Sequence, residues 1–101
     1  MTRPNLPRAP SMSLLKAVPR GKFKRQSRLM ERRGKNMDKL RDVITQLASG
    51  AQLPYRYHDH ALTGNWKGFR ECHIEPDWLL IYQIDGTDLI LERTGTHSDL
   101  F

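Results

Sequence analysis

The clearest periodic pattern in the chain runs from residue 37 to residue 48. Apolar side chains recur there at three- and four-residue intervals, the spacing of one helical face. These side chains are Met37, Leu40, Val43, Ile44, Leu47 and Ala48. Asn36 is a suitable N-cap, and Ser49-Gly50 supplies a stop. The pattern predicts an amphipathic helix over residues 37–48.

A short strand and a basic helix are predicted before this segment. Residues 14–18 are mostly apolar and are followed by Pro19, whose ring stops a strand and suits a first helical turn. The basic segment after Pro19 ends at Gly34. Residues 1–12 carry three prolines and little apolar content, which predicts a flexible N-terminal extension before a single domain over residues 13–101.

The sequence pattern in the second half of the chain is typical of β-strands. Residues 69–74, 78–84 and 89–94 are rich in aromatic and branched side chains and are joined by the short turns 75–78 and 85–88. Short connections favour antiparallel neighbours. We therefore predict an α+β domain, in which a short N-terminal strand precedes two helices packed on one face of an antiparallel sheet, with the other face available.

Composition and charge narrow the classes of function. The 101 residues carry a net charge of +6, but residues 1–50 hold 13 Lys and Arg against 3 Asp and Glu, whereas residues 51–101 hold 4 against 8. A basic half of this kind attracts nucleic acid or an acidic protein, although a solvated basic surface without a partner is the plainer interpretation. The single cysteine, Cys72, excludes an internal disulfide and indicates a reducing compartment. No apolar run is long enough to cross a membrane, so we expect a cytoplasmic protein with no membrane partner.

Polar groups of one kind gather in the second half. All four histidines lie in the last 44 residues. The predicted topology brings His60, His73, Asp77, Arg93 and His97 towards one end of the sheet. General acid–base cleavage of RNA needs these groups, because one imidazole removes the ribose 2′-OH proton while another group protonates the departing 5′-oxygen. A guanidinium such as that of Arg93 offers planar donors to the phosphate, and Asp77 can orient an imidazole.

Other interpretations of the same residues stay open at this point. His58-x-His60 with a third ligand could bind a transition metal, although no known ligand spacing matches and a nearby guanidinium would repel the ion. His60 could simply make a hydrogen bond in a loop, and Asp77 is common after proline in turns. Trp66 and Trp78 are typical of a core as well as of a stacking platform. The terminal Phe101 could be frayed, or could fold back and stack on a base.

The region from Met37 to Phe101 resembles the YafQ-type toxins of the RelE/ParE superfamily. The motifs that carry the resemblance are Leu53-Pro54, Asp59-His60-x-Leu62-x-Gly64-x-Trp66-Lys67-Gly68-Phe69-Arg70, His73-Ile74-Glu75-Pro76-Asp77-Trp78-Leu79-Leu80-Ile81-Tyr82 and Glu92-Arg93-Thr94-Gly95-Thr96-His97-Ser98-x-Leu100-Phe101. The N-terminal extension departs from the family pattern, and so does Pro19-Arg20-Gly21, where a Ser or Thr cap is usual.

The resemblance implies a RelE-like, microbial-ribonuclease-like fold and the toxin half of a type II toxin–antitoxin pair. Such a toxin cuts messenger RNA in the A site of the 70S ribosome without a metal or other cofactor, and so inhibits translation. The family's functional residues fall on catalytic His60, His73, Asp77, Arg93 and His97, with Trp78 and Phe101 contacting substrate. His97 is the main proton-transfer candidate.

The family also implies two kinds of partner and leaves two other functions open. The partners are an acidic cognate antitoxin and, only for the joint toxin–antitoxin complex, operator DNA. The first alternative function is that of a non-catalytic toxin that acts by binding, like the gyrase inhibitors of the superfamily. The second is a degenerate protein that retains only antitoxin binding.

Overall fold

A computed structural model describes residues 14–101, so the predicted extension over residues 1–12 lies outside the described residues. The elements in chain order are β1 (Lys16–Pro19), α2 (Gly21–Arg32), α3 (Met37–Ala48), η2 (Tyr55–Tyr57), β2 (His60–Ala61), η3 (Gly64–Trp66), β3 (Arg70–Glu75), β4 (Trp78–Asp85), β5 (Asp88–Gly95) and α4 (His97–Leu100). The α+β class and the two long helices are confirmed. The two-residue strand β2, the 3-10 helices η2 and η3, and α4 are too short for a periodic pattern to reveal.

The sheet has five strands in the order β1-β5-β4-β3-β2. Strands β3, β4 and β5 form the predicted antiparallel meander, and β2 adds to it in the same sense. Strand β1 pairs with β5 in parallel, which makes the sheet mixed. Local sequence cannot reveal this pairing, because a parallel neighbour is reached only through the long connection that contains both helices.

Helix α3 forms where the periodic pattern predicts it. The Asn36 side chain accepts a hydrogen bond from the Asp38 backbone N–H at 3.0 Å, so the N-cap is present. Leu40, Val43 and Leu47 are buried on the inner face. Helix α2 is amphipathic as well: it buries Phe23 and Met30 on its inner face and keeps its basic residues outside.

Residues alternate between the two faces of the sheet, and the helices cover one of them. The main core lies between the helices and this face; its members are Phe23, Met30, Leu40, Val43, Leu47, Leu53, Tyr57, Cys72, Ile74, Trp78, Leu80, Tyr82, Leu89 and Leu91. Cys72 is fully buried, and that burial raises the pKa of its thiol, which keeps the sulfur protonated and unreactive. Leu79 and Ile81 are fully buried as well, but they alternate with Leu80 and so point to the other face.

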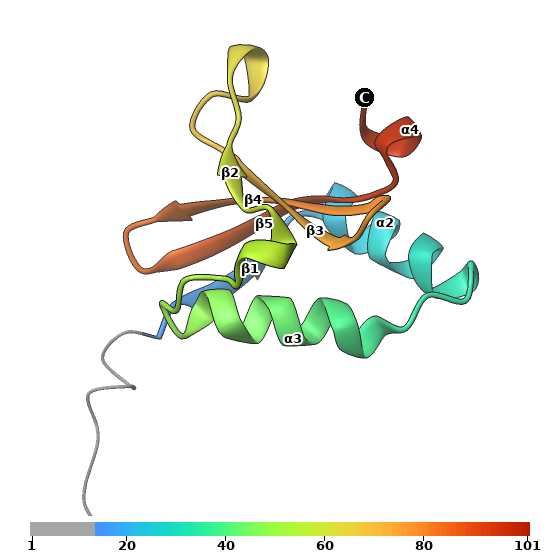
Figure 1. Cartoon of the computed structure of the whole chain (residues 1–101), viewed down its shortest axis with the longest axis horizontal. Helices are drawn as coiled ribbons and strands as arrows, with labels where there is room; N and C mark the ends of the chain where they lie inside the picture. Colours follow the sequence, from blue (N-terminus) through green and yellow to red (C-terminus); the bar gives the residue numbers. More distant parts are fainter. Residues whose placement is uncertain (1–13) are drawn as a thin grey trace, which may run out of the picture.

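We call this other side of the sheet the site face. Two projections rise from it, opposite α3 (Figure 1). One is an arm over residues 60–69 that contains β2 and η3 and is closed by the Leu62 N–H donating to the Phe69 carbonyl at 2.9 Å. The other is α4 at the end of the chain. The site face is therefore an apolar floor between two walls.

Within residues 14–101, no helix combines the length and the hydropathy that spanning a membrane would require.

Candidate active site

Three imidazole rings form a row on the site face. His60 comes from β2, His73 from β3 and His97 from the first turn of α4. The ring centroids of His60 and His73 are 6.4 Å apart, and those of His73 and His97 are 5.8 Å apart. The predicted convergence of these rings is confirmed, while their catalytic role stays a prediction.

Strand register explains why the row forms. Residues paired across neighbouring strands point to the same face. His73 pairs with Leu79, which in turn pairs with Gly95, so the His73 side chain lies over the apolar floor beside the segment that leads into α4. Pairing places His60 opposite Glu71 on the same face. The site lies across the face of the sheet, whereas sequence reasoning placed it at a sheet end.

Asp77 fixes the orientation of His97. Its Oδ1 atom accepts from the His97 backbone N–H at 2.9 Å and lies 2.6 Å from Nδ1 of the same imidazole. The backbone N–H of His97, followed by its ring, lowers the pKa of the Asp77 carboxyl, which is therefore ionised at neutral pH and can only accept. The proton on Nδ1 points at Asp77, and Nε2 is left with a free lone pair in the neutral ring.

Helix α4 has only four residues, and its fixed position depends on its ends. The Thr96 side chain accepts from the Asp99 backbone N–H, and the Asp99 side chain accepts from the Thr96 backbone N–H, which completes a capping box. Arg33, at the C-terminus of α2, donates to Asp99 at 2.7 and 3.2 Å. A Cβ atom on Gly95 would lie 2.9 Å from the Asp99 Cβ, so only glycine lets the chain approach this closely.

The Arg33–Asp99 pair makes the free energy of unfolding depend on pH in a specific way. Arg33 holds the pKa of the Asp99 carboxyl at about 2, with help from the Thr96 backbone N–H. A depressed folded-state pKa stabilises the fold above the unfolded value, and that contribution is lost as the pH falls through the folded value. We expect Asp99→Asn to lower the free energy of unfolding at pH 6, and the difference from the parent to shrink between about pH 4 and pH 2. Urea unfolding of both proteins measures this difference. A constant difference over that range, or the same narrowing in an Arg33→Ala background, would contradict the assignment.

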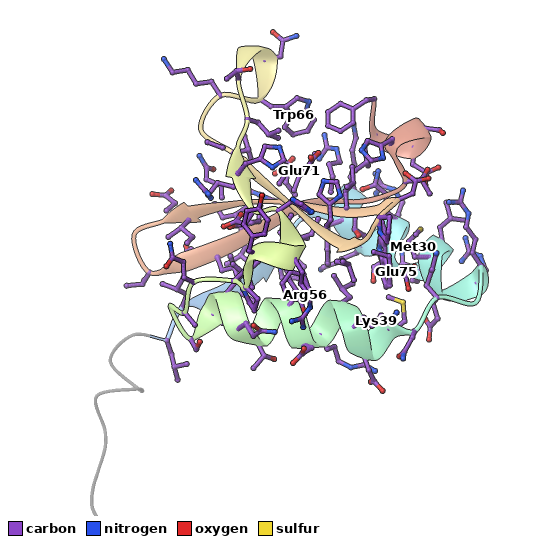
Figure 2. All side chains as sticks on the ribbon, viewed as in Figure 1. Met30, Lys39, Arg56, Trp66, Glu71 and Glu75 are labelled. Atoms are coloured by element: carbon purple, nitrogen blue, oxygen red, sulfur yellow. The ribbon has the colours of Figure 1, made fainter. Side chains whose placement is uncertain are left out.

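Sequence reasoning missed a buried carboxylate in the row. Glu71 is 6% exposed, and its Oε1 lies 3.4 Å from Nε2 of His60 and 3.7 Å from Nε2 of His73. Figure 2 shows Glu71 at the foot of the arm, near the middle of the sheet. The available signal was the period of two in β3, which places Glu71 and His73 on one face. This carboxylate supplies negative charge to two of the three imidazoles.

Arg93 lies at the other side of the site face, against Trp66. Its guanidinium carbon is 5.3 Å from the centre of the Trp66 ring, and one of its nitrogens donates to the Glu92 carboxylate at 2.6 Å and to the Glu92 carbonyl at 2.9 Å. Trp66 also contacts Phe101 edge to face, at 6.4 Å between ring centroids. The remaining guanidinium donors are available to an anion, and the ring of Phe101, whose residue is 61% exposed, can meet a base.

The structure separates the roles of the two tryptophans. Trp78 was expected to contact substrate, but it is fully buried and donates to the Thr94 hydroxyl at 2.9 Å. That expectation is wrong, because a base cannot stack on a ring without an exposed surface. Trp66 is half-buried and extends from the arm towards the α4 side of the face (Figure 2). Its position between Gly64 and Gly68 was the available sign of a loop residue.

The loop before β2 is held in a strained conformation. His58 has a backbone φ of +49°, a value that residues other than glycine adopt rarely. The centroid of its ring lies 5.6 Å from that of His73. Asp59 anchors the loop, since it accepts from the Tyr82 hydroxyl at 2.6 Å and from the Arg70 guanidinium at 3.3 and 3.4 Å. Through its contact with His73, the His58 ring adjoins the imidazole row.

Among residues 14–101, no group of three or more His, Cys, Asp or Glu side chains has the arrangement of a metal site. The row instead combines spaced imidazoles, two carboxylates and a guanidinium over an apolar floor. This arrangement can accept, donate and relay protons around a bound anion.

Comparisons with known proteins agree with this fold. The sequence model of the family described as "Bacterial toxin of type II toxin-antitoxin system, YafQ" matches residues 15–101. The mRNA interferase toxin YafQ of Escherichia coli strain K12 is 45% identical over 82 residues, which cover 80% of this chain and 89% of that relative.

Solved structures give the same result. The crystal structure of YafQ from E. coli strain BL21(DE3) aligns with a TM-score of 0.82 at 41% identity, over 86% of this chain and 98% of that one. A crystal structure of the E. coli DinJ–YafQ complex aligns with a TM-score of 0.80 at 42% identity, over the same shares. With a family match over nearly all of the described residues and this likeness in structure, the chain belongs to the YafQ family of bacterial toxins of type II toxin–antitoxin systems.

Proposed function

We infer that this protein is an endoribonuclease that cuts messenger RNA on the ribosome by general acid–base catalysis and so inhibits translation. One observation carries the proposal. Asp77 accepts the Nδ1 proton of His97, and the His97 ring lies 5.8 Å from the ring of His73 between centroids. A base and an acid side by side, with no metal needed, are the groups that RNA cleavage by its own 2′-OH requires. The name mRNA interferase of the E. coli relative supports the same activity.

The chemical step follows from these positions. Nε2 of His97 accepts the proton of the ribose 2′-OH as the 2′-oxygen attacks phosphorus. The bond from phosphorus to the 5′-oxygen breaks, and protonated His73 gives its proton to that oxygen. The products are a 2′,3′-cyclic phosphate and a 5′-hydroxyl, so atoms and charge balance without a cofactor. Each proton transfer contributes about 10²–10⁴-fold to the rate.

Two other groups bind the substrate in this proposal. Arg93, stacked on Trp66, directs its free N–H donors at the phosphate as charge builds up on it. Phe101 stacks on a base beside the cut. His60 and Glu71 complete the row and balance its charge.

The basic outer face of α2 suits a nucleic-acid surface. Its exposed cationic side chains are Lys22, Lys24, Arg25, Arg28 and Arg32. In the proposed function they contact ribosomal RNA phosphates, which a cluster of Lys and Arg binds without reading sequence. The partner that neutralises the toxin is an acidic antitoxin, supported by the complex of the E. coli relative with DinJ. The joint complex binds operator DNA, and the protein acts in the cytoplasm, where ribosomes translate.

The test is to map RNA ends in a reconstituted translation reaction. We expect the purified protein to create new 3′-phosphate or cyclic-phosphate ends within the codons of a translated message. A matched message without a start codon should stay intact, because only a ribosome presents the substrate. New ends on both messages would remove the ribosome from the proposal. A toxin that acts by binding alone would block translation without new ends on either.

A further inference from the structure

A cavity of about 660 Å³ adjoins the imidazole row and has no role in the chemistry above. It is lined by residues of η2 and β3, with His58 from the loop between η2 and β2. His60 and His73 are shared between this cavity and the row. The cavity therefore begins at His73, beside the place where the proposed mechanism puts the phosphate. The volume lies within the range of about 300–1,000 Å³ that is usual for small-ligand sites.

The walls of this cavity have the mixed character of a base-binding pocket. Ile74 and Pro76 contribute apolar surface, and Tyr57 an aromatic ring. Arg56 lies over that ring, with 4.6 Å between its guanidinium carbon and the ring centre, and donates to the Tyr57 hydroxyl at 3.0 Å. In Figure 2 Arg56 extends from η2 towards α3. The stacking and the hydrogen bond hold the guanidinium plane, while its other donors are available to a ligand.

The one carboxylate among the other walls is already neutralised. Glu75 binds Lys35 through one oxygen at 2.8 Å and Lys39 through the other at 2.9 Å. The hydrogen bond from Lys35, followed by that from Lys39, lowers the pKa of Glu75. Both oxygens have a partner and two ammonium groups face them, so the wall does not repel RNA.

His58 supports the interpretation as a ligand site. Its ring lines the cavity and touches both Tyr55, at 5.4 Å between centroids, and His73. The backbone reaches this place only through the strained φ of +49°. Strained residues of this kind persist where the surrounding structure holds them, and they cluster at ligand sites.

We propose that this cavity binds one nucleobase of the RNA substrate next to the cut, and that Arg56 reads it as guanine. Guanine presents two adjacent acceptors, O6 and N7, which match the paired donors of a guanidinium. The inference rests on the proposed ribonuclease function and adds the source of its base preference.

Mapping the cuts on a message library with randomised codons tests the pocket. We expect guanine to be favoured about fivefold or more at one fixed position beside the cut. Arg56→Lys keeps the charge but loses the planar fork, and should remove this preference while cutting continues. His58→Gly tolerates the positive φ and opens one wall, so it should weaken the preference too. Arg41→Lys, at an exposed ion pair with Asp38 on α3, is the matched control and should cut like the parent.

Measuring both base preference and nucleotide binding distinguishes a failure of the pocket assignment from a failure of the ribonuclease function. If the parent cuts without preference, or Arg56→Lys retains it, the pocket assignment is wrong and the ribonuclease function stands. If the parent cuts nothing, titration with guanosine 3′-monophosphate and cytidine 3′-monophosphate, followed by NMR, still decides. We expect guanosine 3′-monophosphate to shift the NMR signals of Arg56, His58 and His73 at a lower concentration than cytidine 3′-monophosphate does. Arg56→Lys should remove that difference. Equal binding of the two nucleotides to the parent overturns the proposal.

Discussion

Replacing His97 with alanine should slow RNA cleavage by about 10²–10⁴-fold while the protein stays folded. The reason is local: His97 is exposed, and its ring makes its hydrogen bond to Asp77 at the surface. The variant therefore loses a proton-transfer group without opening a cavity in the core. The measurement is the rate of appearance of new ends on a translated message, with thermal unfolding of the same preparation as the check on folding.

Two matched variants make the result specific. Ser98→Ala changes the next exposed residue of α4 and should cut at the parent rate. Asp77→Asn keeps the shape of the side chain but removes the charge that holds the Nδ1 proton, so it should slow cleavage without a loss of substrate affinity. If His97→Ala cut at more than about a tenth of the parent rate, the role of His97 in proton transfer would be untenable.

Replacing Trp78 with alanine should lower the free energy of unfolding by about 3–5 kcal/mol. Trp78 is fully buried, and its indole N–H donates to the Thr94 hydroxyl, so the change leaves a large cavity and removes a buried hydrogen bond. The free energy of unfolding of a domain of this size is only about 5–15 kcal/mol, so we expect a measurable fraction of the variant to be unfolded. Urea unfolding followed by circular dichroism measures the loss.

The control is an aromatic side chain of similar size at the surface. Tyr55 is 88% exposed, and Tyr55→Ala should change the free energy of unfolding by less than about 0.5 kcal/mol. Trp78→Phe, which refills most of the volume, should be intermediate in stability and should still cut RNA. A Trp78→Ala protein of unchanged stability that no longer cuts would show that Trp78 acts on the substrate after all.

The elements that sequence predicted well are those whose cause is local. Helix α3 has its apolar spacing within twelve residues and its cap at the residue just before them, Asn36, and the observed bounds, Met37–Ala48, match the prediction. The strands of the meander were predicted within one residue at each end because turn residues bound them. Strand β1 could be recognised as a strand, but its parallel partner β5 lies about seventy residues away and is chosen by packing.

The candidate site also contains residues that could be predicted from sequence and residues that could not. His60, His73, Asp77, Arg93 and His97 could be named from sequence because their chemistry is unusual for a structural role and because the family motifs contain them. The roles of the two tryptophans could not be separated, since an indole is equally suited to a core and to a surface platform. Only packing placed one of them under the sheet and the other against Arg93.

The sequence by itself determined the class of fold, the set of ionisable groups and the basic character of α2, because periodicity, residue chemistry and charge are local properties. The tertiary structure alone decided which groups meet. Strand register placed Glu71 between two imidazoles, the capping of α4 fixed His97 on Asp77, and the turn at His58 placed its ring in the wall of a cavity beside them. These outcomes depend on contacts between residues far apart in the chain, whose geometry is set only when the core between sheet and helices has formed.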